Sequence, residues 1–124
     1  MSTGLLLRYW MPVAVYAGLI FYSSSQSRPS PPALWLLVHL GDKTIHAIEY
    51  GILGILCYRA FYYAAGTAAS RMAWLLAIAA SVGYGITDEI HQVFVPARDP
   101  NGWDLLADGI GAAVAASCWH WLKV

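Results

Sequence analysis

The chain has 124 residues, of which 59% are hydrophobic and only 11% are charged, and its formal net charge is zero. A soluble globular domain has about 25% charged residues, so the composition predicts one small integral membrane domain over residues 1–124 and excludes a separate soluble domain. No run of basic residues indicates a nucleic-acid partner.

Four hydrophobic stretches are long enough to cross a bilayer, which takes about 20 residues of helix. In chain order they cover residues 5–22, 44–63, 72–91 and 103–121. The first stretch has Arg8 near its start and small residues after its end, so a cleaved signal peptide is an alternative for it. Its length and its Trp and Tyr residues favour a retained span, because these side chains gather at membrane interfaces.

The segment between the first two stretches begins with a Ser- and Pro-rich run that cannot form a helix interior. It continues with Ala33 to Leu40, which is apolar but too short to span, and we expect a short interfacial helix there. The loop over residues 93–102 holds Pro96, Pro100 and an Asn-Gly turn, and we expect it to be compact. The predicted fold class is all-α: an integral membrane bundle of four transmembrane helices with a short interfacial helix in the first outer loop.

The basic residues predict the orientation, because cytoplasmic loops carry an excess of Lys and Arg. With the N-terminus inside, the inner side holds four basic residues: Arg8, Arg59, Arg71 and Lys123. The outer side holds Arg28, Lys43 and Arg98, of which the last two belong to a polar cluster described below. We therefore expect a multi-pass protein with both termini in the cytoplasm, and packing thiols at Cys57 and Cys118 rather than a disulfide.

All seven acidic residues lie on the opposite, outer side, at the ends of the last three stretches. Residues three or four apart share a helix face, so the polar residues form three stripes that can converge. The stripes are Asp42, Lys43, His46, Glu49 and Tyr50; then Tyr84, Asp88, Glu89, His91 and Gln92; then Asp104, Asp108 and Gly111. Ionisable groups in a bilayer are costly, so we interpret the cluster as one functional site.

Glu49 illustrates the cost, since it lies seven residues after Asp42, or about 10 Å along a helix. A lone charge at the centre of a bilayer costs about 2.5–3.5 kcal/mol. We expect His46 or Lys43 to serve as its partner, and Arg98 to reach Asp108 from the loop.

The residue types indicate catalysis, ligand binding or metal binding. A histidine beside a carboxylate suits acid–base chemistry near neutral pH, and the candidate catalytic residues are His46, Asp42, Glu49, Asp88 and Glu89. Lys and Arg hold phosphates and carboxylates, and the candidate ligand-binding residues are Lys43, Tyr50, Gln92, Arg98, Asp104 and Asp108. Nitrogen and oxygen ligands at helical spacing suit a divalent metal ion, for which the candidates are His46, Glu49, Asp88 and His91.

Three other interpretations stay open. The charges could only lock the helices together, since structural ion-pair networks also gather charges. The site could capture a ligand without changing any bond. It could also relay protons or ions, although transport would require an oligomer to complete a path. We read His39 and His120, which lack polar neighbours at helical spacing, as interfacial.

Small residues recur at four-residue spacing, which lets helix backbones approach closely in lipid. The sets are Ala14 and Gly18; Ala107, Gly111 and Ala115; and Ala112 and Ala116. We expect tight helix packing at all three, because polar side chains need close neighbours to pair with.

Several motifs resemble those of the VanZ-like family, in order and over nearly the whole chain. They are Ser24-Ser25-Gln26, then Asp42-Lys43-x-x-His46-x-x-x-Tyr50, then Asp88-Glu89-x-x-Gln92-x-x-x-Pro96-x-Arg98, then Asp104-x-x-x-Asp108-x-x-Gly111. The chain departs from the family pattern at Ala97, where glycine is frequent, and at Asp108, where asparagine is frequent.

The resemblance implies a four-helix protein of the bacterial inner (plasma) membrane. It also implies a link to antibiotic resistance, since the founding member confers low-level resistance to the glycopeptide teicoplanin. On this basis we expect a cell-envelope protein that acts on or binds an amphipathic anionic ligand at the outer leaflet. The expected partners are membrane lipid and a lipid-linked envelope precursor or lipoglycopeptide.

Overall fold

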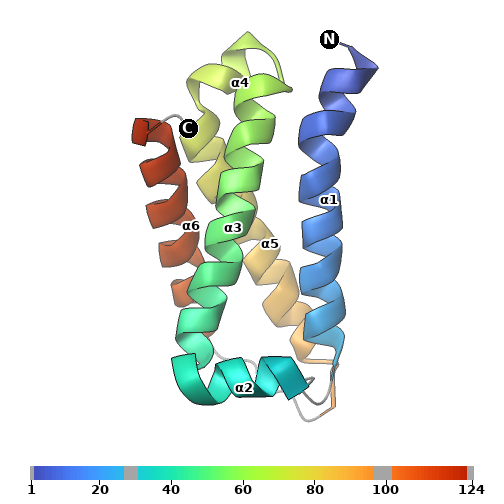
Figure 1. Ribbon diagram of the computed structural model, residues 1–124, viewed down its shortest axis with the longest axis vertical. Helices are drawn as coiled ribbons and strands as arrows, with labels where there is room; N and C mark the ends of the chain where they lie inside the picture. Colours follow the sequence, from blue (N-terminus) through green and yellow to red (C-terminus); the bar gives the residue numbers. More distant parts are fainter. Residues whose placement is uncertain (1, 27–30, 97–101, 123–124) are drawn as a thin grey trace.

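The computed structural model describes residues 2–26, 31–96 and 102–122, apart from the side chains of Ala33, Leu36, Leu37 and Asp42. All regular structure in these ranges is helical (Figure 1). The helices are α1 Thr3–Ser25, α2 Pro31–Leu40, α3 Asp42–Tyr63, α4 Thr67–Arg71, α5 Ala73–Gln92 and α6 Gly102–Leu122. The all-α prediction is confirmed, and the four long helices begin and end close to the four predicted stretches.

Four transmembrane helices are not confirmed. Among the described helices, α1 alone is long and apolar enough to cross a membrane by length and composition, and only 6% of its most apolar window is buried within the protein. Helices α3, α5 and α6 have 22, 20 and 21 residues, about 30 Å of helix each. They are long enough, but charged side chains such as Lys43, Glu49 and Arg59 in α3 lower their hydropathy.

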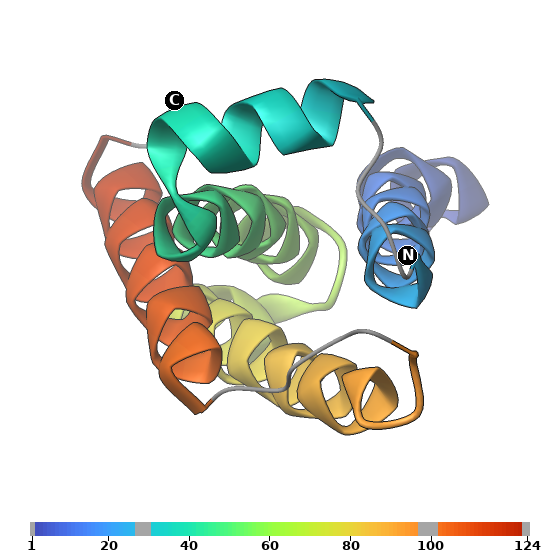
Figure 2. The same cartoon turned by 90° about the horizontal axis from the view of Figure 1, so that it is seen from below.

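The four long helices run along the long axis of the molecule, and α2 crosses one end of them (Figure 1). The start of α1 and the end of α6 lie at the opposite end, near the short α4. Viewed from the α2 end, α3 lies between α2, α6, α5 and α1 (Figure 2). Helix α3 contacts every other helix, while α1 contacts α3 and α5. The ends that carry the predicted polar stripes therefore all lie at the α2 end.

The corner between α2 and α3 places the first polar stripe. Pro31 opens α2, a position where the missing N–H costs nothing. Gly41 separates the two helices with φ at 84°, a backbone conformation that glycine adopts without steric cost. The chain therefore turns sharply into α3. The short helix expected over 33–40 is present, and its interfacial location stays a prediction.

The bundle is apolar on its outer surface, and its interior combines large side chains such as Leu53 and Tyr58 with small and polar ones. The fully buried residues include Ala60, Ala77, Ala112 and Ala116 together with Ser81. Large apolar side chains point outward from every long helix, and examples are Val15, Ile48, Ile90 and Val114, all more than half exposed. Exposed apolar surface on this scale marks contact with a membrane or another protein.

Glycines set the distance between α3 and α6. A Cβ on Gly54 would lie 3.1 Å from the carbonyl oxygen of Ala112, and one on Gly51 would lie 3.3 Å from that of Gly111. A Cβ on Gly111 would lie within 2.7 Å of the Cα of Ala47. The predicted close packing is thus confirmed for α6. It is wrong at Gly18 in α1, where an added Cβ would meet nothing within 4 Å.

Candidate functional site: a histidine between two buried carboxylates

Three helices contribute buried polar side chains to one region at the α2 end. Helix α3 supplies His46, α5 supplies Asp88 and Gln92, and α6 supplies Asp104 and Asp108. Each of the five is at most 8% exposed. The helical spacing accounts for this arrangement, because residues four apart lie on the same face and each face points into the bundle.

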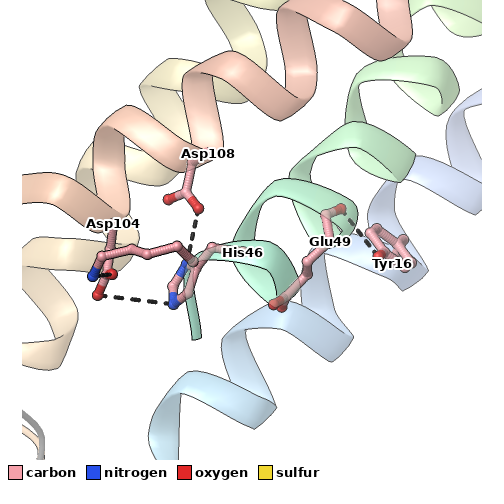
Figure 3. A network of polar contacts seen from close by, with 6 residues as sticks. Tyr16, His46, Glu49, Asp104 and Asp108 are labelled. Atoms are coloured by element: carbon pink, nitrogen blue, oxygen red, sulfur yellow. Dashed lines mark hydrogen bonds and ion pairs between the residues drawn. The ribbon is translucent and has the colours of Figure 1, made fainter. Parts of the chain in front are cut away.

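Both ring nitrogens of His46 face carboxylates of α6 (Figure 3). Its Nδ1 lies 2.8 Å from Oδ1 of Asp108, and its Nε2 lies 3.9 Å from Oδ2 of Asp104. The second oxygen of Asp104 accepts a hydrogen bond from the Lys43 ammonium. These four residues, Lys43, Asp104, His46 and Asp108, are referred to as the His46 network.

The His46 network runs from the surface into the interior. The side chain of Lys43 is 48% exposed, whereas that of Asp108 is fully buried. An imidazole with a carboxylate oxygen beside each ring nitrogen has the geometry of a group that donates or accepts a proton. The network can therefore hold a charged head group at Lys43 and supply or accept a proton at His46.

The inner end of the network is closed by α5 and by Tyr50. A Cβ on Gly85 would lie 3.2 Å from Oδ2 of Asp108 and 3.4 Å from Cε1 of Tyr50. Tyr50 is fully buried and interacts electrostatically with both Asp88 and Asp108. A side chain at position 85 would crowd the buried carboxylate, so Gly85 is what allows α5 to approach it.

The contacts described between His46 and carboxylates involve Asp104 and Asp108 of α6, and the expected pairing of Glu49 with His46 or Lys43 stays a prediction. The Glu49 carboxylate points from α3 toward α1 (Figure 3). Its backbone carbonyl accepts a hydrogen bond of 3.0 Å from the Tyr16 hydroxyl. Glu49 therefore lies next to the His46 network, at the contact between α3 and α1.

Four other predicted site residues are either located away from the His46 network or not described by the structure. Glu89 is half-buried on α5. The His91 ring stacks on Phe21 of α1, with ring centroids 4.4 Å apart. The side chain of Asp42 and the whole of Arg98 fall outside the described residues, so the expected contact between Arg98 and Asp108 stays a prediction.

The candidate metal ligands do not come together. Across the described ranges, no group of three or more His, Cys, Asp or Glu side chains is arranged to hold a metal ion. His46 faces α6, while His91 packs against α1. The two i, i+3 pairs that suggested a metal site therefore point their histidines at different helices.

Sequence reasoning missed a second contact between α3 and α6. The Tyr58 hydroxyl and Nδ1 of His120 lie 2.8 Å apart, a partner on another helix that spacing within α6 could not reveal, and the interfacial reading of His120 stays a prediction. The pair lies 62 residues apart in sequence, as do His46 and Asp108. An equal separation is what two helices running in the same direction give, because moving along one helix moves the contact equally far along the other, and α3 and α6 both begin at the α2 end (Figure 1).

Comparisons with curated proteins and with solved structures give no significant match. A family model described as VanZ/LLP1 matches residues 8–123, which includes the whole of the His46 network. The resemblance inferred from the motifs is thereby confirmed. With a match over nearly its full length, the chain belongs to the VanZ/LLP1 family.

Proposed function

We propose that this chain is a multi-pass membrane protein of the bacterial cell envelope, in which α1, α3, α5 and α6 cross the inner membrane and both termini are cytoplasmic. The apolar outer surface of all four helices supports this proposal, because lipid-facing positions must be apolar while polar groups face the bundle interior. Family membership supports an envelope role of the VanZ type.

The positions of the basic residues support the orientation. The Arg59 guanidinium lies 5.4 Å from the ring centroid of Tyr9 and 6.0 Å from that of Trp119. These residues lie toward the end opposite α2, where the sequence predicts the cytoplasmic side. The His46 network then lies at the outer leaflet.

The site is proposed to bind an amphipathic ligand with an anionic head group, such as a lipid-linked envelope precursor or a lipoglycopeptide. The half-exposed Lys43 can receive a phosphate or carboxylate. The hydrocarbon tail of the ligand would remain in the bilayer beside the exposed apolar side chains of the helices. If the protein is an enzyme, His46 donates a proton to the ligand or accepts one from it. Such acid–base catalysis typically accelerates a reaction by a factor of about 10²–10⁴.

The observation that carries this proposal is the position of His46 between Asp104 and Asp108, with one end of the network exposed. The same burial favours one alternative, in which the network only locks α3 to α6. Buried ion pairs often contribute little net stability compared with apolar packing, so a purely structural role is the weaker explanation.

Replacing His46 by asparagine tests the two roles separately, because an asparagine amide can donate to Asp108 but cannot exchange a proton near neutral pH. We expect a host expressing the wild-type chain to gain protection against teicoplanin, and a host expressing His46→Asn to lose it. The measurement is teicoplanin and vancomycin susceptibility at matched membrane levels of folded protein.

His120→Asn is the matched control, since it changes the other histidine at the same helix pair. We expect this variant to protect as the wild type does. Full protection by His46→Asn would favour the structural lock. No protection by the wild type would reject the resistance function for this chain.

A further inference from the structure

The two carboxylates beside His46 lie at unequal distances from its ring. Nδ1 and Oδ1 of Asp108 are 2.8 Å apart, within the usual range of about 2.7–3.2 Å for a hydrogen bond from nitrogen to oxygen. Nε2 and Oδ2 of Asp104 are 3.9 Å apart, which is too long for a hydrogen bond. The two ring nitrogens are therefore chemically distinct, because Asp108 is bonded to one of them and Asp104 only faces the other.

The hydrogen bond at Nδ1 decides where the ring proton of His46 lies. An ionised carboxylate has no proton to donate, so Nδ1 is the donor in its contact with an ionised Asp108. In a neutral histidine one nitrogen carries the proton and the other carries a lone pair, and the hydrogen bond of one nitrogen sets the state of the other. With the proton on Nδ1, the lone pair of neutral His46 is on Nε2.

The Asp108 carboxylate is enclosed on the side away from His46. Its side chain has no exposure, and a Cβ on Gly85 of α5 would lie only 3.2 Å from Oδ2. Among the described residues Oδ2 has no hydrogen-bond partner, so Nδ1 of His46 is the donor that the described part of the chain offers to this carboxylate. A buried acceptor that loses its donor is costly, and the contact therefore holds the ring of His46 in one orientation.

Nε2 lies on the side of the His46 network that leads to the surface. It faces Asp104 (Figure 3), and the other oxygen of Asp104 accepts a hydrogen bond from Lys43, whose side chain is half exposed. Nδ1 instead faces the fully buried Asp108. A ligand that arrives from the surface therefore approaches Nε2 and not Nδ1.

We infer that His46 and Asp108 form a histidine–aspartate dyad, in which Asp108 is the positioning residue and Nε2 of His46 is the atom that exchanges the proton. Neutral His46 then acts first as a base. An O–H bond of the ligand or of a water molecule breaks, its electron pair stays on the oxygen, and the proton forms a bond with Nε2. In hydrolases with such a pair, the aspartate holds the imidazole in the tautomer that leaves Nε2 to react. This inference rests on the proposed function in its enzymatic form and deepens it, because it names the reacting atom and the residue that orients it.

Nitrogen NMR of the full chain tests the dyad directly. The protein carries ¹⁵N-labelled histidine, is placed in phosphatidylcholine vesicles and is kept at a mildly alkaline pH, where an ordinary histidine with a pKa of about 6.5 is neutral. A nitrogen with a proton and a nitrogen with a lone pair give well-separated signals. We expect Nδ1 of His46 to give the signal of an N–H group and Nε2 to give that of a lone-pair nitrogen. His46→Asn shows which of the four histidines these signals belong to, since it removes them.

Two matched variants on α6 separate the two carboxylates. Asp108→Ala removes the acceptor, so the proton should no longer be held on Nδ1 and the distinct signals of the two nitrogens should be lost. Asp104→Ala, one turn earlier and beyond hydrogen-bond distance from the ring, should leave the proton on Nδ1. Nδ1 of His120 contacts Tyr58 of α3, so unchanged His120 signals show that α3 and α6 stay packed in each variant. At matched levels of folded protein, Asp108→Ala should lose protection against teicoplanin as His46→Asn does, which a merely structural contact would not cause.

The wild-type signals alone can overturn the dyad, so the test does not depend on whether Asp108→Ala folds. A ring proton on Nε2 would mean that Asp108 donates to Nδ1, and protons on both nitrogens would leave no lone pair to accept another. Full protection by folded Asp108→Ala would also overturn the positioning role. The proposed function is judged separately: the expected tautomer without protection keeps the dyad and rejects the resistance function, whereas protection with the proton on Nε2 does the reverse.

Discussion

Replacing Gly111 by alanine is expected to destabilise the bundle by at least about 3 kcal/mol, the upper part of the range for overpacked cores. The added Cβ would overlap the carbonyl group of Ala47 and lie 2.7 Å from its Cα. These are backbone atoms, which cannot rotate away as a side-chain end can. Relief requires α3 and α6 to separate, and thermal unfolding of the purified protein in detergent measures the loss.

Gly83→Ala is the control with the opposite sign. A Cβ at position 83 of α5 would meet nothing within 4 Å, and alanine is favoured over glycine in a helix interior by up to about 1 kcal/mol. We expect Gly83→Ala to unfold at the same temperature as the wild type or higher. Equal unfolding temperatures for Gly111→Ala and the wild type would show that α3 and α6 are not held this close.

The same substitution should impair the site, because Gly111 lies one helical turn after Asp108 and Ala47 follows His46 directly. The 2.8 Å contact between His46 and Asp108 depends on the short distance between the two backbones. Any separation of the helices lengthens it. The predicted family motif that ends in Gly111 thus has a physical reason in this chain.

Replacing His46 by alanine is expected to cost about 3–5 kcal/mol, the usual penalty for leaving a buried charge without its partner. The side chain of Asp108 has no exposure, so its carboxylate cannot recover hydration. The double variant His46→Ala/Asp108→Ala should be less destabilised than the sum of the single variants, because it removes both charges. A double-mutant cycle on unfolding free energies measures this coupling.

Lys43→Ala is the comparison from the exposed end of the network. The side chain of Lys43 is 48% exposed, and exposed ion pairs are typically worth about 1 kcal/mol or less. We therefore expect a small effect on stability from this variant. Additive effects of the His46 and Asp108 substitutions would contradict the contact between them, whereas a large effect of Lys43→Ala would contradict its exposure.

The separate roles of the polar residues follow from where each helix face points. The stripe of α3 carries both His46 and Glu49, yet the first faces α6 and the second lies between α3 and α1. Substitutions at His46 and at Glu49 therefore alter contacts with different helices.

Helical periodicity in the sequence was enough to locate the long helices and to place His46, Asp88, Asp104 and Asp108 at one end of the molecule. Spacing of three or four residues defines a face, and an acid in an apolar helix has to face the interior. The same reasoning explains the short α2 helix, since Ala33 to Leu40 is apolar but bounded by prolines and Gly41.

Which side chains touch across two helices depends on how each helix is rotated about its axis and on how closely the helices approach. Neither quantity can be read from the residues of one helix alone. His46 had a carboxylate nearby on its own helix, but its ring nitrogens face Asp104 and Asp108, 58 and 62 residues away in the chain. The close approach at Gly111 and the turn at Gly41 bring those residues together. The sequence by itself determined which residues are polar, buried and at one end, while only the packing of α3 against α6 decided which of them touch.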